Sequence, residues 1–176
     1  MEKNNVNIVH WTLLDHRQWN IYMGATSGGL CYLGPHNAPF DELEEWVKKR
    51  LPDHLLVKDK AALEPYALEL IGYIEGKLKD FTLPLDLHGT SFQQSVWKAL
   101  MEIPYGETVT YSDIAESIQK PKSVRAVGTA IGANPILITV PCHRVIGKNG
   151  KLTGFRGGLE MKKQLLDLET QHKISK

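Results

Sequence analysis

The segment Pro141-Cys142-His143-Arg144-Val145 carries the residues of this 176-residue chain that are best suited to chemistry. It follows the apolar run 136–140 and places a thiol beside an imidazole and a guanidinium. The imidazole can accept the thiol proton, and a nearby positive charge favours the thiolate, which is the nucleophilic form of cysteine. We therefore expect Cys142 to be a nucleophile, with His143 and Arg144 both favouring its thiolate. A second interpretation has Arg144 serving the structure by pairing with a carboxylate.

The composition is that of a globular protein in a reducing compartment. The chain is 42% hydrophobic and 23% charged, with two cysteines and no Cys-x-x-Cys pair. We expect Cys31 to be packed in a strand, and the scattered histidines show no metal-site spacing. Neither a signal peptide nor a long apolar run is evident, which predicts a cytoplasmic protein without membrane contact whose thiols stay reduced.

Charge is unevenly divided along the chain. Residues 1–85 hold 9 Lys and Arg against 12 Asp and Glu, whereas residues 86–176 hold 12 against 8. The C-terminal half is therefore better suited to meet a polyanion, although so small an excess is a weak argument by itself.

The first half of the chain predicts a sheet with two helices. Residues 8–33 have the pattern of strands, with a hairpin turn at Ser27-Gly28-Gly29. Apolar spacing predicts helices over 41–51 and 64–78, with Pro65 in the first turn of the second and Leu68 on its buried side. Residues 81–88 are expected to be extended.

The second half predicts three short helices. We expect the first to run from Ser91 to Met101 with a capping box that begins at Ser91, and the second to begin at Thr110 and end near Ile118. Ser123 is expected to cap the third, over 124–133. The tight polar turn between the last two helices predicts a helix-turn-helix. Further on, Lys162 and Lys163 suit a solvated helix face.

The helix expected over 124–133 is unusually rich in small residues, namely Ala126, Gly128, Ala130, Gly132 and Ala133. Glycine lowers helix stability, so its presence indicates that something approaches this helix closely. That neighbour is either a partner molecule or simply another helix. Arg125 is the only long side chain near the start of the helix.

Five motifs follow one another in order and spacing: 105–111 (YGETVTY), 125–128 (RAVG), 134–135 (NP), 141–145 (PCHRV) and 157–159 (GGL). Together they resemble the O6-alkylguanine-DNA alkyltransferase family. The resemblance extends from about Phe92 to Glu169, and the first half of the chain is similar only loosely.

The resemblance implies an α+β fold of two domains. Residues 1–87 would form a small domain of sheet and helices. Residues 88–176 would form a helical, winged-helix-like domain whose helix-turn-helix binds DNA.

The resemblance also implies roles at the reaction centre. Cys142 would accept the alkyl group, His143 would be its base through a water molecule, and Glu169 would hold the histidine in its working tautomer. Asn134 would be the hinge between the recognition helix and the cysteine segment. Tyr111 would stack near the target base and donate a hydrogen bond to its ring nitrogen.

For DNA, the resemblance implies that Arg125 fills the gap left by an extruded nucleotide. Ser123 suits a phosphate contact, and the further positions expected to bind DNA or the base are Ala126, Val145, Phe155 and Arg156. Phe155 stands where many members have tyrosine, so it can stack but lacks the hydroxyl. Arg156 is larger than the small polar residue of some relatives, which matters less if the backbone N–H serves the base.

The expected substrate is double-stranded DNA containing O6-alkylguanine, with O4-alkylthymine left open, and the expected acceptor is a monomer that needs no cofactor. Because water does not readily cleave a thioether, each chain would react once. Two other classes compete with this interpretation. One is a DNA-binding regulator with Cys142 as a redox sensor, and the other is a cysteine hydrolase.

Overall fold

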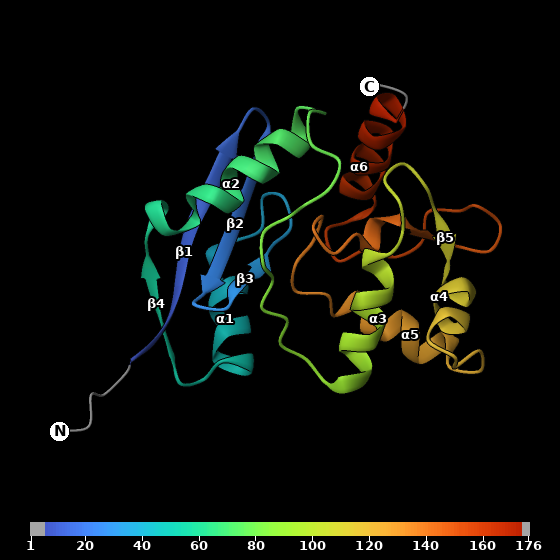
Figure 1. The fold of residues 1–176 in the computed structure, drawn as a ribbon, viewed down its shortest axis with the longest axis horizontal. Coiled ribbons are helices and arrows are strands. Elements are labelled where there is room, and N and C mark those ends of the chain that lie inside the picture. Colours follow the sequence, from blue (N-terminus) through green and yellow to red (C-terminus); the bar gives the residue numbers. More distant parts are fainter. Residues whose placement is uncertain (1–5, 174–176) are drawn as a thin grey trace.

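The computed structural model describes residues 6–173 and contains a four-stranded sheet followed by a helical region (Figure 1). The strands are β1 (Asn7–His16), β2 (Trp19–Thr26), β3 (Gly29–Leu33) and β4 (His54–Lys58), in the spatial order β3-β2-β1-β4. The β1-β2 and β2-β3 pairs are antiparallel, and β4 pairs with β1 in parallel. The predicted α+β class is confirmed.

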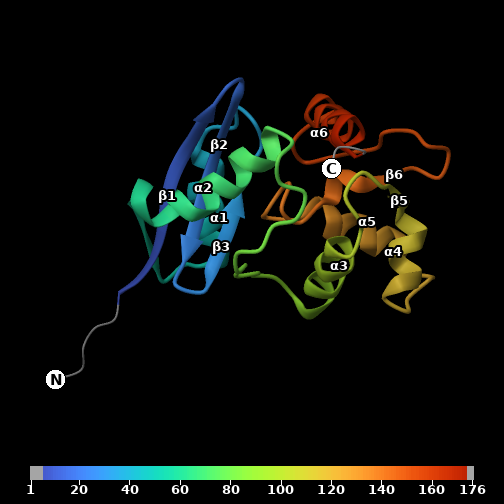
Figure 2. The same cartoon turned by 45° about the horizontal axis from the view of Figure 1, so that its top comes forward.

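Helices α1 (Phe40–Arg50) and α2 (Lys60–Ile74) cover opposite faces of this sheet (Figure 2). Side chains alternate along a strand, so Ile21 and Met23 of β2 belong to the large core under α2, while Tyr22 packs on the smaller one under α1. The smaller core consists of Val9, Cys31, Tyr32, Leu43, Val47 and Leu51. Cys31 is packed in a strand, as expected.

The predicted start of helix α2, residue 64, was wrong. It begins at Lys60 because the side chain of Asp59 accepts a hydrogen bond from the Ala62 N–H at 3.1 Å. Pro65 therefore lies in the second turn, not the first. Leu68, expected on the buried side, is 59% exposed. Strand β4 was not predicted, because the short run 54–58 does not alternate polar and apolar residues.

The second half contains α3 (Ser91–Met101), α4 (Tyr111–Ser117), α5 (Val124–Gly132) and α6 (Leu159–His172). A short 3-10 helix, η1 (Cys142–Arg144), carries the cysteine motif. Two short strands, β5 (Val109–Thr110) and β6 (Val145–Ile146), pair in parallel beside it. Helices α4 and α5 form the predicted helix-turn-helix. Within residues 6–173, no helix is long and apolar enough to cross a membrane.

The caps of these helices explain where they begin. Thr110 caps α4 as expected. The cap of α3 is Thr90 rather than Ser91: its hydroxyl accepts from the Gln93 N–H, and the Gln93 side chain accepts from the Thr90 N–H. Ser123 precedes α5, but its side chain makes no capping hydrogen bond.

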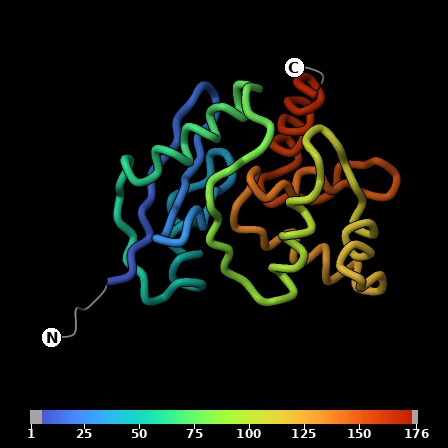
Figure 3. The backbone as a smooth tube through the Cα atoms, in the orientation of Figure 1, coloured from blue at the N-terminus to red at the C-terminus, as the bar shows by residue number. Residues whose placement is uncertain are grey.

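The two halves share one continuous core. A long segment without regular helix or strand crosses between them (Figure 3). Within this segment, Leu85 forms an isolated β-bridge with Leu30 of β3. The large core joins Leu14, Ile21 and Leu70 of the first half to Leu100 and Leu165 of the second. A second bridge links Leu33 at the end of β3 to Ile136, close to the cysteine motif.

We expect Thr90→Ala to lower the free energy of unfolding by about 1 kcal/mol, because it removes the threonine side of the capping box of α3. Ser91→Ala is the matched control, since Ser91 is exposed and is not the cap; its effect should stay below about 0.5 kcal/mol. Chemical denaturation of the two variants measures this difference, and equal losses would contradict the assignment of the cap.

Candidate active site

Asn134, directly after α5, fixes the backbone that leads to Cys142. Its side chain is fully buried; the amide nitrogen donates to the Val140 carbonyl at 2.8 Å, and the amide oxygen accepts from the Ile136 N–H at 3.0 Å. One side chain thus clamps both ends of the 136–140 segment. Ile138, between them, has a positive φ of 70°, which a β-branched residue rarely adopts. The hinge role of Asn134 between the recognition helix and the cysteine segment stays a prediction.

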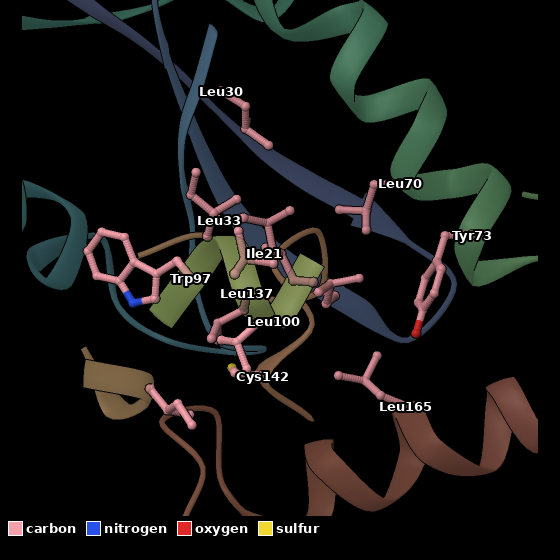
Figure 4. Close-up of a cluster of buried hydrophobic side chains, with 14 of the residues drawn as sticks. Ile21, Leu30, Leu33, Leu70, Tyr73, Trp97, Leu100, Leu137, Cys142 and Leu165 are labelled. Carbon is pink, nitrogen blue, oxygen red and sulfur yellow. The ribbon is translucent and has the colours of Figure 1, made fainter. Parts of the chain in front are cut away.

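The Cys142 thiol is 2% exposed and lies in the large core beside Leu100 and Leu137 (Figure 4). Burial raises its pKa, and this outweighs the lowering by a hydrogen bond from the Asn134 side chain and by the charges of Arg156 and Lys162. The expectation that His143 and Arg144 favour a thiolate is therefore wrong for the protein at rest. Adjacency in sequence does not point those side chains at the sulfur.

Glu169, on α6, is the centre of a buried hydrogen-bond network. Its carboxylate accepts from Tyr73 Oη (2.5 Å), Gly106 N (3.0 Å), His143 Nε2 (2.5 Å), Arg144 Nε (2.8 Å) and Arg144 Nη2 (3.1 Å). The pKa of this carboxyl falls to about 2: burial raises it, but the hydrogen bonds and charges of His143 and Arg144 lower it by more. The group is a carboxylate at neutral pH.

The carboxylate fixes the tautomer of His143. An ionised carboxylate can only accept, so the proton of the neutral imidazole must lie on Nε2. Burial is the largest effect on the His143 pKa and lowers it, despite the opposing influence of Glu169. The ring is therefore neutral at pH 7. Its Nδ1 is buried and has no partner among the protein groups of residues 6–173, which leaves a lone pair that can accept a proton.

Arg144 pairs with a carboxylate, as the second interpretation of this residue predicted. Its guanidinium binds both oxygens of Glu169, and Nη1 donates to the Ile103 carbonyl at 2.7 Å. Its charge is thus committed to the carboxylate rather than to the thiol.

Lys162 also differs from the sequence prediction. It is 1% exposed rather than solvated, whereas Lys163 is exposed as expected. The Lys162 ammonium donates to the carbonyls of Val145 (2.6 Å) and Thr153 (3.1 Å). Burial lowers its pKa, while the charge of an ionised Cys142 would raise it. Sequence gives little signal for a buried lysine, because most lysines are exposed.

The loop 147–158 lies against this centre. The Tyr111 hydroxyl, from the start of α4, makes a hydrogen bond of 2.8 Å with the Thr153 hydroxyl. Phe155 packs on the large core, and Val145, just before the loop, is fully buried. The side chain of Arg156 is turned to the first half of the chain: it donates to the carbonyls of Asn134 (3.2 Å) and Leu33 (3.5 Å) and lies over the Tyr32 ring.

The expected DNA-binding residues of α5 lie on its outer side. Arg125 and Ala126 are exposed, and together with Ser123 and Lys122 they line a groove of about 680 Å³. A methyl group on Gly128 would meet the Tyr111 ring at an ordinary 3.8 Å, and one on Gly132 would meet nothing within 4 Å. Neighbouring helices therefore do not require these glycines, which favours an outside partner.

Two buried polar side chains of the site were missed by sequence reasoning, Lys162 and Tyr73. No group of three or more His, Cys, Asp or Glu side chains in residues 6–173 is arranged to hold a metal ion.

Glu169→Gln should destabilise the protein by about 3 kcal/mol at pH 7, because the amide presents a donor to groups that are themselves donors and leaves Arg144 without its charge partner. The folded pKa is depressed, so the stabilisation is present above the unfolded value of about 4.3 and is lost as the pH falls toward about 2. In urea unfolding, the difference between the free energies of unfolding of wild type and variant should therefore become smaller as the pH falls through that range.

Glu160→Gln is the control for this prediction, since Glu160 is exposed at the start of the same helix. It should change stability by less than about 0.5 kcal/mol. A loss of unfolding free energy in Glu169→Gln that stayed constant from neutral to strongly acidic pH would show that the charge of the carboxylate is not what the network stabilises.

Comparison with known proteins gives the same picture over nearly the whole chain. Residues 91–171 match the family model described as "6-O-methylguanine DNA methyltransferase, DNA binding domain". Residues 9–87 match the one described as "6-O-methylguanine DNA methyltransferase, ribonuclease-like domain". A curated relative, the inducible methylated-DNA–protein-cysteine methyltransferase of Bacillus subtilis, is 60% identical over 169 residues, covering 96% of this chain and 94% of the relative.

Solved structures agree. The chain is similar to Mycobacterium tuberculosis O6-methylguanine methyltransferase, with a TM-score of 0.81 and 39% identity over 96% of both chains. It is also similar to M. tuberculosis OGT in complex with DNA, with a TM-score of 0.79 and 41% identity, covering 93% of this chain and 94% of that one. The chain therefore belongs to the 6-O-methylguanine DNA methyltransferase family, whose members repair DNA by transferring the alkyl group to a protein cysteine.

Proposed function

We propose that this protein repairs double-stranded DNA by moving the alkyl group of O6-alkylguanine onto the sulfur of Cys142. The observation that carries the proposal is the buried series Cys142, His143 and Glu169, in which the carboxylate holds the imidazole proton on Nε2 and leaves Nδ1 as a base. A nucleophile, a base and an orienting carboxylate are the parts that thiol chemistry needs.

The reaction is a displacement at the alkyl carbon. A water between the thiol and Nδ1 of His143 carries the thiol proton to the imidazole, the sulfur attacks the alkyl carbon, and the bond from that carbon to O6 breaks. The electron pair of that bond goes to the guanine, and a hydrogen bond from the Tyr111 hydroxyl to the base ring stabilises the developing charge. The product is a thioether on Cys142, so one chain repairs one lesion.

The DNA side of the proposal rests on α5 and its groove. The small residues of α5 let the helix lie close to the minor groove floor, which carries little sequence information and suits detection of damage at any sequence. Ser123 contacts a phosphate, and Arg125 fills the stack that the extruded nucleotide leaves. The 2% exposure of Cys142 means that covering groups move as the base enters. Tyr111 then exchanges its bond with Thr153 for one with the base.

The proposal also covers the domain division, the oligomeric state and the cellular compartment. The chain divides into an N-terminal domain, 1–87, and an alkyl-accepting domain, 88–176. It acts as a monomer, because every group of the proposed reaction comes from a single chain. It works in the cytoplasm, where the thiol that the reaction consumes is kept reduced.

The two competing classes fit the site less well. A redox sensor needs an accessible thiol of low pKa, whereas burial raises the pKa of Cys142. A cysteine hydrolase needs an oxyanion site for its acyl intermediate, and the segment 141–145 gives no local sign of one. Both alternatives remain distinguishable by the state of the protein after reaction.

Incubation with an excess of duplex DNA containing O6-methylguanine should add a single methyl group per chain, on the peptide that contains Cys142. Mass spectrometry of the digested protein measures the site, and the amount of repaired DNA measures the stoichiometry. Cys142→Ala should abolish the transfer, and Cys31→Ala, which alters the other buried cysteine, should keep it. Repair beyond one lesion per chain, with unmodified protein, would indicate a hydrolase; oxidation without methylation would indicate a sensor.

Arg125→Ala should slow transfer from duplex DNA by about tenfold, roughly 1.4 kcal/mol of barrier, while changing transfer from the free base by less than about twofold. The reason is that only the duplex needs a filled stack. Lys122→Ala is the matched control, because it removes the same charge from the same groove. It should weaken DNA binding without slowing transfer at saturating DNA. Equal losses for Arg125→Ala on both substrates refute the proposed role.

A further inference from the structure

We infer that Tyr73, on α2 of the first half of the chain, is a positioning residue of the alkyl transfer: its hydroxyl donates to Glu169 and so limits how strongly the carboxylate attracts a proton onto His143. The inference rests on the proposed function and adds to it a group from outside the helical half. It makes α2 part of the reaction centre rather than only a packing element.

The geometry places Tyr73 inside the network. Its hydroxyl donates to Glu169 Oε2 at 2.5 Å, and this is the same oxygen that accepts from His143 Nε2. The hydroxyl also lies 3.4 Å from His143 Nε2. In Figure 4 the oxygen of Tyr73 points from α2 toward Leu165 of α6, the helix that carries Glu169. The side chain is 0% exposed, so water cannot replace this donor.

Toward the Glu169 carboxylate, the Tyr73 hydroxyl can only be a donor. Burial and the Glu169 charge raise its pKa well above the ordinary value of a phenol, so the hydroxyl keeps its proton throughout the neutral range. A hydrogen bond to a charged acceptor in a buried site is among the stronger ones in proteins. The hydroxyl therefore withdraws part of the negative charge that Oε2 offers to the imidazole.

The consequence concerns the charge state of His143. A carboxylate stabilises the imidazolium and so raises the histidine pKa, while burial, Arg144 and Lys162 lower it. A base must be neutral before it can accept the thiol proton. By sharing Oε2, Tyr73 weakens the carboxylate's influence and keeps the ring neutral to lower pH. The charged groups that act on the ring are Glu169 and Lys162 of α6 and Arg144 of η1, and the hydroxyl of Tyr73 on α2 lies beside it.

A purely structural role would rest on the ring of Tyr73 rather than on its hydroxyl. The ring packs against Phe81, with centroids 5.5 Å apart, and edge-on against Tyr105, with centroids 6.1 Å apart. Tyr73→Phe keeps both ring contacts and removes only the hydroxyl. Tyr105→Phe is a matched control, because the Tyr105 hydroxyl is also buried but has no hydrogen-bond partner within residues 6–173.

The test is the rate of methyl transfer from O6-methylguanine duplex DNA as a function of pH, together with the NMR titration of the His143 imidazole in the full chain. In Tyr73→Phe, the loss of the donor should raise the histidine pKa. The acid limb of the rate profile should move up by about half to one pH unit, which is about a threefold to tenfold slower rate below that limb and little change above it. Tyr105→Phe should leave both measurements at their wild-type values.

A second variant guards against a Tyr73→Phe protein that does not fold. Incorporation of 3-fluorotyrosine at position 73 keeps the ring and the hydroxyl but makes the phenol a stronger acid and a stronger donor. The histidine pKa and the acid limb should then move down instead of up. Opposite shifts in the two variants support the inference, and a folded variant of either kind whose profile and titration coincide with wild type overturns it.

These outcomes are separate from failure of the proposed function. If wild-type protein acquires no methyl group on Cys142 in the same DNA, the proposed function fails whatever the Tyr73 variants do. If wild type is methylated and the variants show no shift, only the role of Tyr73 fails.

Discussion

The structure depends most on one buried carboxylate. Glu169 receives five hydrogen bonds from four residues, which lie on α2, in the turn after α3 and on η1. A buried charge is costly unless such partners surround it, and removing a donor leaves part of the carboxylate charge without compensation. The network therefore fixes the relative positions of α2, η1 and α6, and the same fixing gives His143 its tautomer. Stability and reactivity share a single arrangement.

The thiol occupies a second constrained position. Its burial keeps it protonated at rest, so its reactivity has to come from a base rather than from a low pKa. The positive charges that act on it come from Arg156 and Lys162, both distant in sequence and both held by backbone carbonyls. A thiol of this kind resists unspecific oxidation and alkylation, which suits the single use that we propose for Cys142.

The sequence predicted those parts of the site that a motif contains and not those that only the fold brings together. Cys142, His143 and Asn134 lie in recognisable segments, and the pairing of Glu169 with His143, 26 residues apart, followed from resemblance alone. The partner of Arg144, the burial of Lys162 and the position of Tyr73 had no sequence signal, because spacing along a chain does not state the direction of a side chain. The start of α2 had a signal in Asp59, which the preference for proline in a first turn overrode.

Packing and hydrogen bonds join the two halves of the chain across their border. Composition and motifs place this border near residue 87, and several contacts cross it: the large core continues across it, Arg156 reaches the Leu33 carbonyl and the Tyr32 ring, and Tyr73 reaches Glu169. Groups from the first half thus contact the loop 147–158 on one side and the Glu169 carboxylate on the other. Because both contacts are hydrogen bonds to fixed backbone or buried atoms, small shifts of α2 or β3 change the site directly. The sheet half is therefore a structural part of the reaction centre, although it carries none of the motifs.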